Sequence, residues 1–286
     1  MRPALTRESN EALERRVDAL ETKPALDFDA VERAVERIRR PDAVASRLSE
    51  SVRYAQRVEA EVAGLSIETL LPYASTDYIG RFLAVWVPDE RGHGEALERL
   101  LKTLGLPAYV PRGEEVVPLH NRIAGRLGRL SGHAYEMVAM TYHTIGALNE
   151  RLAMGAYGQL ATVASELGED ELVETLFSPL RRDESAHLGY YRTYARQLRP
   201  RLRRWQLAVV RALIVHTYAP VGAGCAPDKA PFGRVLIELE NDPENPSIAE
   251  LVHDIASELL ARPNTTLPPF VHRALRGCLD RARATT

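Results

Sequence analysis

Apolar residues recur at every third or fourth position along most of the chain, and no segment alternates apolar and polar residues as a half-buried strand would. This period predicts amphipathic helices over residues 8–21, 28–39, 42–71, 76–104, 118–166, 169–198, 203–218, 248–260 and 268–282. Pro72, Gly105, Gly168 and Pro200 follow the longer helices, where such helix breakers are common. The pattern therefore predicts an all-α protein with four long helices, whose two halves are joined by a crossover around residues 109–115.

Two of the long helices carry the same short motif, Asp-Glu-x-x-His. Its two copies are Asp89-Glu90-Arg91-Gly92-His93 and Asp183-Glu184-Ser185-Ala186-His187. A Glu and a His three positions apart lie on one face of a helix, where both can bind the same metal ion. The chain has eight histidines, so about 0.04 such motifs are expected by chance. The repetition therefore predicts a site rather than two solvated acidic helix faces.

A lone glutamate precedes each motif by roughly one helical hairpin. Glu59 and Glu150 each interrupt an apolar stripe of their helix, so both are expected to point inward. Glu61 lies on a more polar face and remains the alternative to Glu59. The predicted ligands of two metal ions are Glu59, Glu90, His93, Glu150, Glu184 and His187.

Each residue type has a physical role in such a site. Glutamates bridge two cations and neutralise their charge, while a neutral imidazole binds a metal ion through one ring nitrogen. The other ring nitrogen needs an acceptor. Across an antiparallel helix pair, Asp89 is expected to serve His187, and Asp183 to serve His93. The alternative is that both aspartates are ordinary surface acids.

Four further residues near the motifs are candidates for a pocket or an electron path. They are Trp86, His143, Tyr190 and Tyr191. A core histidine that bonds to a backbone carbonyl is the favoured interpretation of His143, and core packing is an equal alternative for the aromatic residues. Pro88 should kink its helix directly before the first motif, and its role stays open.

The motif segments resemble those of a known enzyme family. Trp86-Val87-Pro88-Asp89-Glu90-Arg91-Gly92-His93, Asn149-Glu150-Arg151 and Arg182-Asp183-Glu184-Ser185-Ala186-His187 are similar to the metal-binding segments of the soluble acyl-carrier-protein desaturases, over about residues 45–198. The resemblance implies a ferritin-like four-helix bundle with additional N- and C-terminal helices. It also implies two iron ions, O2 as co-substrate, a ferredoxin-type external electron donor, an acyl substrate tethered to a carrier protein, and a homodimer.

This resemblance suggests a division of the chain and a set of functions. Residues 1–40 would form an N-terminal helical arm, residues 41–200 the di-iron four-helix bundle, and residues 201–286 helices packed on it, within one domain. The favoured function is an O2-dependent desaturase or hydroxylase of an acyl or carrier-bound substrate. Two alternatives stay open, an oxygenase of a small-molecule biosynthetic pathway, for example in N-oxygenation, and an iron-handling protein without organic substrate. An Mn/Fe pair also stays open.

A basic run follows the second motif. It consists of Arg192, Arg196, Arg199, Arg201, Arg203 and Arg204. One interpretation is a docking site for an acidic carrier protein. The other is a solvated helix end whose charges favour the helix dipole.

Bulk composition narrows the function classes further. With 286 residues, 45% of them apolar, the chain can bury a large core. The net charge of −2 argues against a nucleic-acid binder, and no apolar run approaches the roughly 20 residues of a membrane span. Residues 1–21 are charged throughout, unlike a signal peptide, and Cys225 and Cys278 have no metal-binding spacing. We therefore expect a cytoplasmic protein with reduced thiols.

Overall fold

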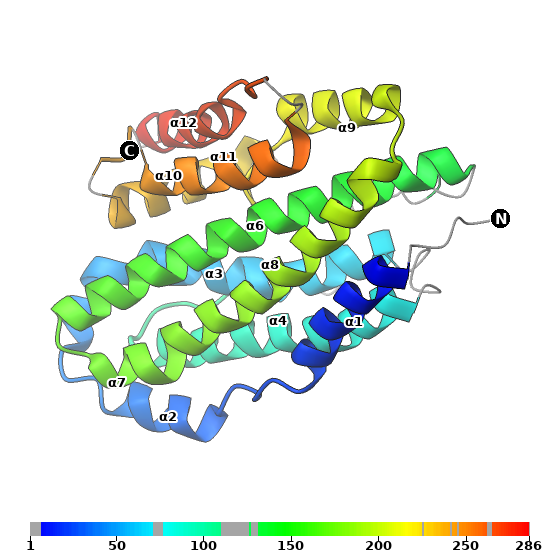
Figure 1. The fold of residues 1–286 in the computed structure, drawn as a ribbon. Coiled ribbons are helices and arrows are strands. Elements are labelled where there is room, and N and C mark those ends of the chain that lie inside the picture. Colours follow the sequence, from blue (N-terminus) through cyan, green and yellow to red (C-terminus); the bar gives the residue numbers. More distant parts are fainter. Residues whose placement is uncertain are drawn as a thin grey trace.

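The structure, a computed structural model, describes residues 7–70, 77–109, 126, 131–224, 226–240, 242–244, 246–261 and 265–285, and every regular element in these ranges is helical. The all-α prediction is therefore confirmed (Figure 1). The α-helices are α1 (Arg7–Glu21), α2 (Phe28–Glu36), α3 (Pro41–Leu70), α4 (Asp77–Thr103), α6 (Gly132–Glu166), α7 (Asp170–Leu172), α8 (Ser178–Leu198), α9 (Arg204–Thr217), α10 (Lys229–Leu239), α11 (Ser247–Leu260) and α12 (Phe270–Arg283). No helix in these ranges combines the length and apolar character that crossing a membrane would require.

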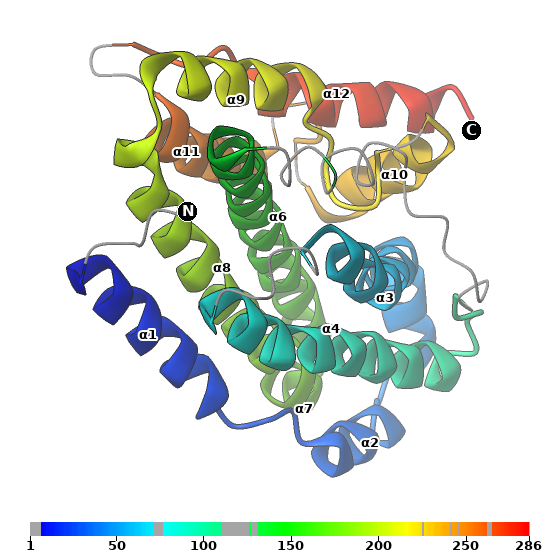
Figure 2. The same cartoon turned by 90° about the vertical axis from the view of Figure 1, so that its right-hand side faces the viewer.

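Four long helices, α3, α4, α6 and α8, lie together at the centre of the molecule (Figures 1 and 2). α6 packs along α8 and α3 packs along α4, while contacts of α3 with α6 and of α4 with α8 join the two pairs. α6 and α8 run in opposite directions (Figure 1). The two helices that carry the motifs, α4 and α8, are therefore neighbours.

Shorter helices cover two sides of this central group (Figure 2). α9 and α11 contact α6, α10 contacts α3, and α12 packs on α10 and α11. On the other side, α1 contacts α4 and α8, and α2 contacts α4. Segments from both ends of the chain thus cover two sides of the central helices.

Two long helices end at glycines, as the sequence predicts. Gly105 follows α4 with a φ of 67°, and Gly168 follows α6 with a φ of 77°. After α6, the Gly168 N–H donates to the carbonyl of Ser165 and the Glu169 N–H to the carbonyl of Ala164, which is the Schellman arrangement. A residue with a β-carbon would be strained at this left-handed backbone, so the glycines determine where the chain turns.

The helix of the second motif differs from the prediction at its start. Instead of one α-helix over 169–198, α7 leads into a π-helical turn, Val173–Phe177, and then into α8. Pro179 has no N–H to donate to the Thr175 carbonyl, as a continuous α-helix would require. The wider turn shifts the side-chain register of α8 relative to α7, so it affects where the second motif points.

One helix was not predicted from the sequence. α10 buries Phe232, Val235 and Leu236, which have helical spacing. Pro231 and the irregular segment before it conceal this period, because the apolar stripe spans barely two turns. Packing against α3 and α12 compensates for the weak local signal.

Smaller differences concern helix boundaries. α2 ends at Glu36 rather than at residue 39. α4 continues through Pro88 as one helix. Of the predicted helix over 118–166, the structure describes residue 126 and the part from 131 onward. Cys225 and the crossover over 109–115, apart from Tyr109, lie outside the described residues.

Two apolar clusters fill the interior. The first includes residues of α1, α4, α6, α8 and the C-terminal helices, and the second includes residues of α2, α3, α4 and α6. α4 passes from one cluster to the other, with Trp86 and Val87 in the first and Ala96 and Leu97 in the second. The Asp-Glu-x-x-His motif of α4 therefore lies at the junction between the two apolar clusters.

Gly146 allows α6 to approach α8 closely, one turn before Glu150. A β-carbon at Gly146 would lie 2.6 Å from the ring of Tyr191. We expect Gly146→Ala to destabilise the protein by about 1–3 kcal/mol through overpacking, although alanine is the better helix former. Gly277→Ala in α12 is the matched control, because nothing lies within 4 Å of its added β-carbon, and it should stabilise by about 0.5–1 kcal/mol. Denaturant unfolding measures both, and a fully stable Gly146→Ala variant would contradict the close approach.

Candidate metal centre

The six predicted ligands meet in the interior of the central helices. Glu59 comes from α3, Glu90 and His93 from α4, Glu150 from α6, and Glu184 and His187 from α8. All six are buried, with at most 7% of each residue exposed. Glu61, the alternative to Glu59, lies outside this set and pairs with Arg57 at 3.4 Å.

The ligand atoms form two overlapping groups. Glu59, Glu90, His93 and Glu184 make one group, and Glu90, Glu150, Glu184 and His187 make the other, with all candidate ligand atoms of a group within 4.8 Å of one another. Glu90 and Glu184 belong to both groups. Two carboxylates can thus be shared by two cations, each of which also has its own glutamate and histidine.

Both histidines face the carboxylates with Nδ1. His93 Nδ1 lies 3.2 Å from Glu184 Oε1, and His187 Nδ1 lies 3.2 Å from Glu90 Oε1. The Nδ1 atoms therefore occupy the side of each ring from which a cation among the glutamates would be bound.

The Nε2 atoms point to the two aspartates of the motifs. His93 Nε2 lies 3.4 Å from Asp183 Oδ2, and His187 Nε2 lies 3.0 Å from Asp89 Oδ2. These contacts confirm the crosswise pairing expected from the sequence. A carboxylate that accepts the Nε2 proton leaves Nδ1 as the free lone pair, which is the tautomer that a metal ion requires.

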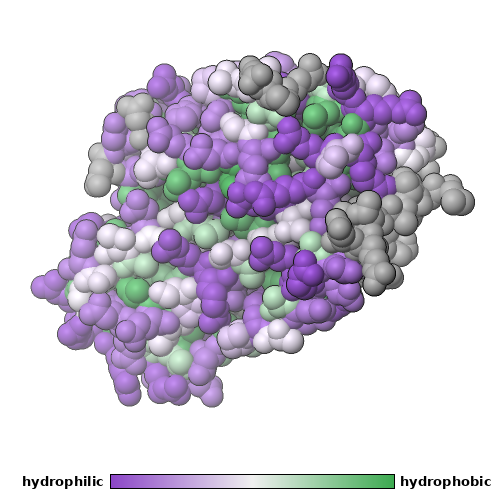
Figure 3. Space-filling model, viewed as in Figure 1, coloured by the Kyte–Doolittle hydropathy of each residue, from purple (hydrophilic) through white to green (hydrophobic). Residues whose placement is uncertain are grey.

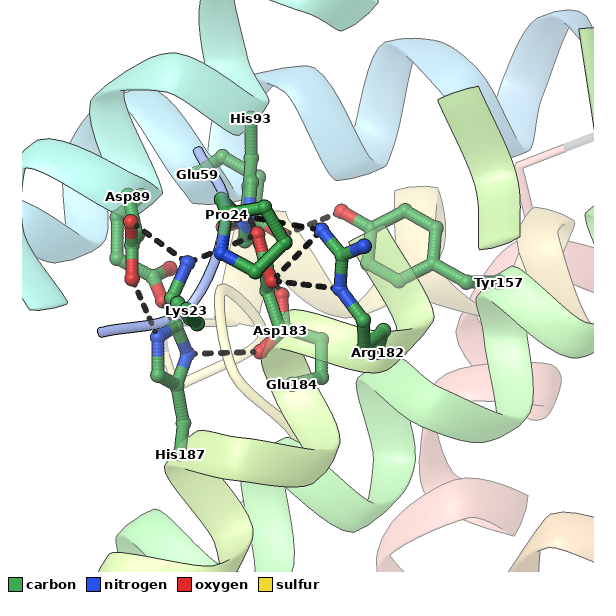
Figure 4. A network of polar contacts seen from close by, with 11 residues as sticks. Lys23, Pro24, Glu59, Asp89, His93, Tyr157, Arg182, Asp183, Glu184 and His187 are labelled. Carbon is green, nitrogen blue, oxygen red and sulfur yellow. Dashed lines mark hydrogen bonds and ion pairs between the residues drawn. The ribbon is translucent and has the colours of Figure 1, made fainter. Parts of the chain in front are cut away.

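Basic residues surround the aspartates (Figure 4). Lys23, from the turn after α1, contacts both Asp89 and Asp183. Arg182 lies 3.4 Å from Asp183 Oδ1 and also approaches the carbonyl of Pro24 at 3.4 Å. Asp183 is 1% exposed, and each aspartate contacts a buried histidine as well as Lys23, which corrects their alternative interpretation as ordinary surface acids.

A tyrosine completes the environment of Glu59. The Tyr157 hydroxyl donates to Glu59 Oε1 at 2.5 Å, and the tyrosine is 2% exposed (Figure 4). This hydrogen bond occupies one carboxylate oxygen and orients the other. Glu59 Oε2 lies 3.9 Å from His93 Nδ1, so the oriented oxygen faces the first ligand group.

Three glutamates of the cluster hold a proton more tightly than a solvated glutamate does. Burial raises the pKa of Glu90 and Glu150 well above the ordinary value, and neighbouring carboxylates add to this rise. Burial and the charge of Glu184 also raise the pKa of Glu59. For Glu184, burial is outweighed by the neighbouring Glu150 and both histidines, which hold its pKa well below the ordinary value. The cluster thus collects positive charge around one ionised carboxylate.

The histidines reinforce this charge pattern. Burial alone would lower the pKa of His187, but hydrogen bonds to Asp89 and Glu184 outweigh it and raise the pKa to about 10. The pKa of His93 is likewise well above its ordinary value, because Asp183 and Glu184 outweigh burial. Divalent cations would neutralise the same carboxylates that protons neutralise here.

The donor set fits metal ions. Glu90 Oε1, His93 Nδ1 and Glu184 Oε1 are buried without a hydrogen-bond partner and face other ligands of the cluster. Protein interiors seldom leave polar atoms in this state. Carboxylate and imidazole donors without thiolates suit iron or manganese. The buried glutamates and histidines could therefore hold metal ions, while their identity as iron remains a prediction.

The predicted aromatic neighbours adjoin the His187 side of the cluster. Trp86 and Phe82 lie with ring centroids 6.5 and 6.3 Å from that of His187. Tyr190 stacks on Phe82 at 3.8 Å, and Tyr191 packs edge-on to Phe82 at 5.0 Å. These buried rings pack against one another beside His187, which agrees with the packing interpretation. A role in electron transfer remains a prediction.

His143 has the environment of a core histidine. Its Nδ1–H donates to the carbonyl of Ala139 at 2.7 Å, and its ring stacks on Tyr194 at 3.7 Å. Burial lowers the pKa of His143 to about 3. The residue is therefore neutral at physiological pH, which agrees with the interpretation favoured from the sequence.

A cleft of about 990 Å³ lies on the outer side of α3 and α4. Its lining includes Ala60 and Gly94, the residues next to Glu59 and His93, but it is dominated by charged residues such as Glu98. Such a lining does not suit an acyl chain.

Part of the basic run is used within the molecule. Arg192 and Arg196 bind the carboxylate of Glu258 on α11. Arg199 donates to the carbonyls of Glu258 and Ala261, at the end of α11. These three arginines fasten α8 to α11, which neither sequence interpretation anticipates, because both place them in solvent.

Comparisons with protein-family models, with curated proteins and with solved structures found no match to this chain. The motif pattern and the geometry of the buried cluster are therefore the grounds on which its function is proposed.

Proposed function

We propose that the protein is a ferritin-like di-iron oxidoreductase, similar to the soluble acyl-carrier-protein desaturases, that uses O2 to desaturate or hydroxylate an acyl or carrier-bound substrate. The observation that carries the proposal is the sharing of Glu90 and Glu184 by two buried Glu/His groups. A single ion would need one such group. Four glutamates and two histidines from four helices are the ligand set of carboxylate-bridged di-metal bundles.

Two bound iron ions would supply the redox chemistry by which O2 is reduced and substrate hydrogen is removed. The residues of this chain would hold those ions and shield them from solvent. Glu90 and Glu184 reach both groups, while Asp89 and Asp183 hold the histidine rings in the ligating tautomer. Tyr157 orients Glu59.

The surroundings of the cluster support an apolar substrate. Phe82 and Trp86 are buried beside His187, and Tyr190 stacks on Phe82. These apolar rings exclude water from that side of the cluster and favour hydrocarbon over polar groups. The reduction of O2 would also require an external electron donor, which in the acyl-carrier-protein desaturases is a ferredoxin-type protein. The family resemblance favours an acyl chain on a carrier protein.

The test is the reaction of the iron-loaded protein with O2. After anaerobic Fe(II) loading and desalting, we expect about two irons per chain, the number of ligand groups, and O2 uptake that depends on a carrier-bound acyl substrate and a reductant. Mass spectrometry should show loss of two hydrogens or gain of one oxygen. Oxygen transfer to an amine instead would support N-oxygenation, and accumulation of many irons per chain without product would support iron handling. A two-iron protein inert to O2 would refute the proposal.

Helix α9 offers a surface for an acidic partner. Trp205, Val209 and Leu213 lie one turn apart on it and are 50%, 50% and 47% exposed. Figure 3 shows apolar residues among hydrophilic ones over this helix. Arg203 and Arg204 are exposed at its start, and no Asp or Glu occurs in residues 185–227. An apolar stripe beside arginines fits an acidic protein such as the substrate carrier.

We expect the triple variant Arg203→Glu, Arg204→Glu, Trp205→Ala to raise KM for a carrier-bound substrate at least about tenfold, because Trp and Arg dominate such contacts. The value of kcat and the metal content should not change. Arg276→Glu, an exposed arginine on α12, is the control for general charge. Steady-state kinetics over a range of carrier concentrations measures the effect. An unchanged KM would show that the carrier docks elsewhere.

A further inference from the structure

The N-terminal arm brings one cation to the outer side of the candidate metal centre. Lys23 lies in the connection between α1 and α2, and its Nζ is 3.0 Å from Asp89 Oδ1 and 3.1 Å from Asp183 Oδ2 (Figure 4). Each aspartate contacts the Nε2 of one histidine, His187 or His93. Lys23 therefore touches both His–Asp pairs at once.

We propose that Lys23 is a positioning residue of the metal centre, which holds both aspartates on their histidines and so couples the two ligand groups. The proposal deepens the di-metal function and rests on it for its consequences. The contacts themselves involve protein atoms alone, so they can be tested whether or not the oxidoreductase proposal holds.

Charge explains why the aspartates need a shared partner. Two carboxylates that converge on one point repel each other, and the repulsion is strong where water is excluded. The Asp183 side chain is 2% exposed and that of Asp89 is 16% exposed. Without a cation between them, the more exposed Asp89 can turn toward solvent and Asp183 toward Arg182, which lies 3.4 Å from its Oδ1, so both histidines would lose their acceptors.

The chemistry of lysine suits this place. An ammonium group is a compact charge with three donors, so it can bind two carboxylates and retain a third donor. The Lys23 side chain is 11% exposed, and lysines seldom reach such burial unless they are paired. Burying this charge is costly, so its partners must recover the cost.

The contact of Lys23 with the two aspartates is not needed to attach the N-terminal arm to the central helices. α1 is fastened to the bundle by other residues, because Leu13, Val17 and Leu20 are at most 2% exposed. Arg81 of α4 also binds α1, at 2.6 Å from Asp18 and 2.5 Å from Glu21. Arg81 therefore provides a matched control, an ion pair of the same arm that does not involve the His–Asp pairs.

The decisive experiment observes the histidines directly in the metal-free protein. With ¹⁵N-labelled histidine, the wild type should show two slowly exchanging imidazole Nε2–H signals, from His93 and His187. In Lys23→Met, both Nε2–H protons should exchange at least about tenfold faster if the aspartates are released. Lys23→Arg, which keeps the charge, and Arg81→Met should retain both signals. Retention in Lys23→Met, or loss in Arg81→Met, would overturn the proposal.

A second measurement follows the consequence for metal binding, with Co(II) as the probe. Loss of a residue that orients ligands typically costs 10- to 100-fold in affinity, so Lys23→Met should weaken both Co(II) sites together and change their visible absorption. Lys23→Arg should recover most of the affinity, and Arg81→Met should equal the wild type. Affinity that is unchanged or raised in Lys23→Met would mean that Lys23 merely adds positive charge, which refutes positioning. Failure of the iron-loaded wild type to use O2 would refute the oxidoreductase while these comparisons still decide the role of Lys23.

Discussion

The double variant Glu90→Ala/Glu184→Ala is expected to bind neither metal ion. Both glutamates belong to both ligand groups, so the variant leaves each group with one glutamate and one histidine. Two ligands are too few to hold a divalent ion against water in a site of this type. After anaerobic Fe(II) loading and desalting, the iron content should fall from about two per chain to a small fraction of one.

Single substitutions should give a graded result. Glu59 and Glu150 each belong to one group, so alanine at either position should remove one ion and leave the other. Glu61→Ala is the control, because Glu61 lies on the same helix as Glu59 but pairs with Arg57, and it should keep both ions. Metal analysis of refolded, monodisperse protein measures the series. Two irons retained in the double variant would exclude a shared, carboxylate-bridged pair.

The ligand positions could be predicted because helical geometry converts sequence spacing into a shared face. Glu90 and His93 stand three positions apart, and no tertiary information is needed to place them together. Glu59 can be chosen over Glu61 because its helical neighbours are apolar. The crosswise use of Asp89 and Asp183 follows once the motif helices are taken as antiparallel.

Other parts of the site depend on tertiary packing that no local pattern encodes. Lys23 stands in an ordinary polar connection before Pro24, and its place depends on how α1 lies across α4 and α8. Tyr157 stands on the predicted inward stripe of Glu150, but its bond to Glu59 depends on the separation of α3 and α6. The π-helical turn before Pro179 was not predicted either, because a search for the α-helical period does not detect a turn with a different period.

The stability of the metal-free protein is expected to fall as the pH rises. The pKa values of Glu59, Glu90 and Glu150 are raised on folding, chiefly by burial, so above about pH 4.5 the folded state binds more protons than the unfolded chain. Hydrogen bonds to acidic partners raise the pKa of His187 to about 10 in spite of burial, and its contribution is therefore lost between about pH 6.5 and pH 10. Over the pH range between its unfolded and folded pKa values, each such group lowers the free energy of unfolding by about 1.4 kcal/mol per pH unit.

Glu184 and Asp183 have the opposite effect, because they make stability rise with pH, but they do so over a lower pH range. For both groups hydrogen bonds from histidine, joined at Asp183 by the charge of Lys23, outweigh burial and lower the pKa on folding. Their contribution is present above the unfolded pKa and is lost only below about pH 4. Burial lowers the pKa of His143 to about 3, so this residue also opposes the trend up to about pH 6.5, but it is one group against three buried glutamates. Between pH 5 and pH 9 the raised groups therefore decide the slope, and the metal-free protein should be most stable near pH 5.

Metal binding should reverse this dependence, because the ligands must lose the protons that stabilise the metal-free state. With each ion at about a thousandfold excess over its Kd, two ions would add about 8 kcal/mol. For a chain of this size we expect Tm to rise on the order of 10–15 °C at pH 8, and by much less at pH 5. Thermal unfolding with and without Fe(II) under anaerobic conditions, at both pH values, measures the difference. A metal-free protein that is as stable at pH 8 as at pH 5 would contradict the protonated cluster. A Tm increment equal at the two pH values would mean that the ions bind away from these carboxylates.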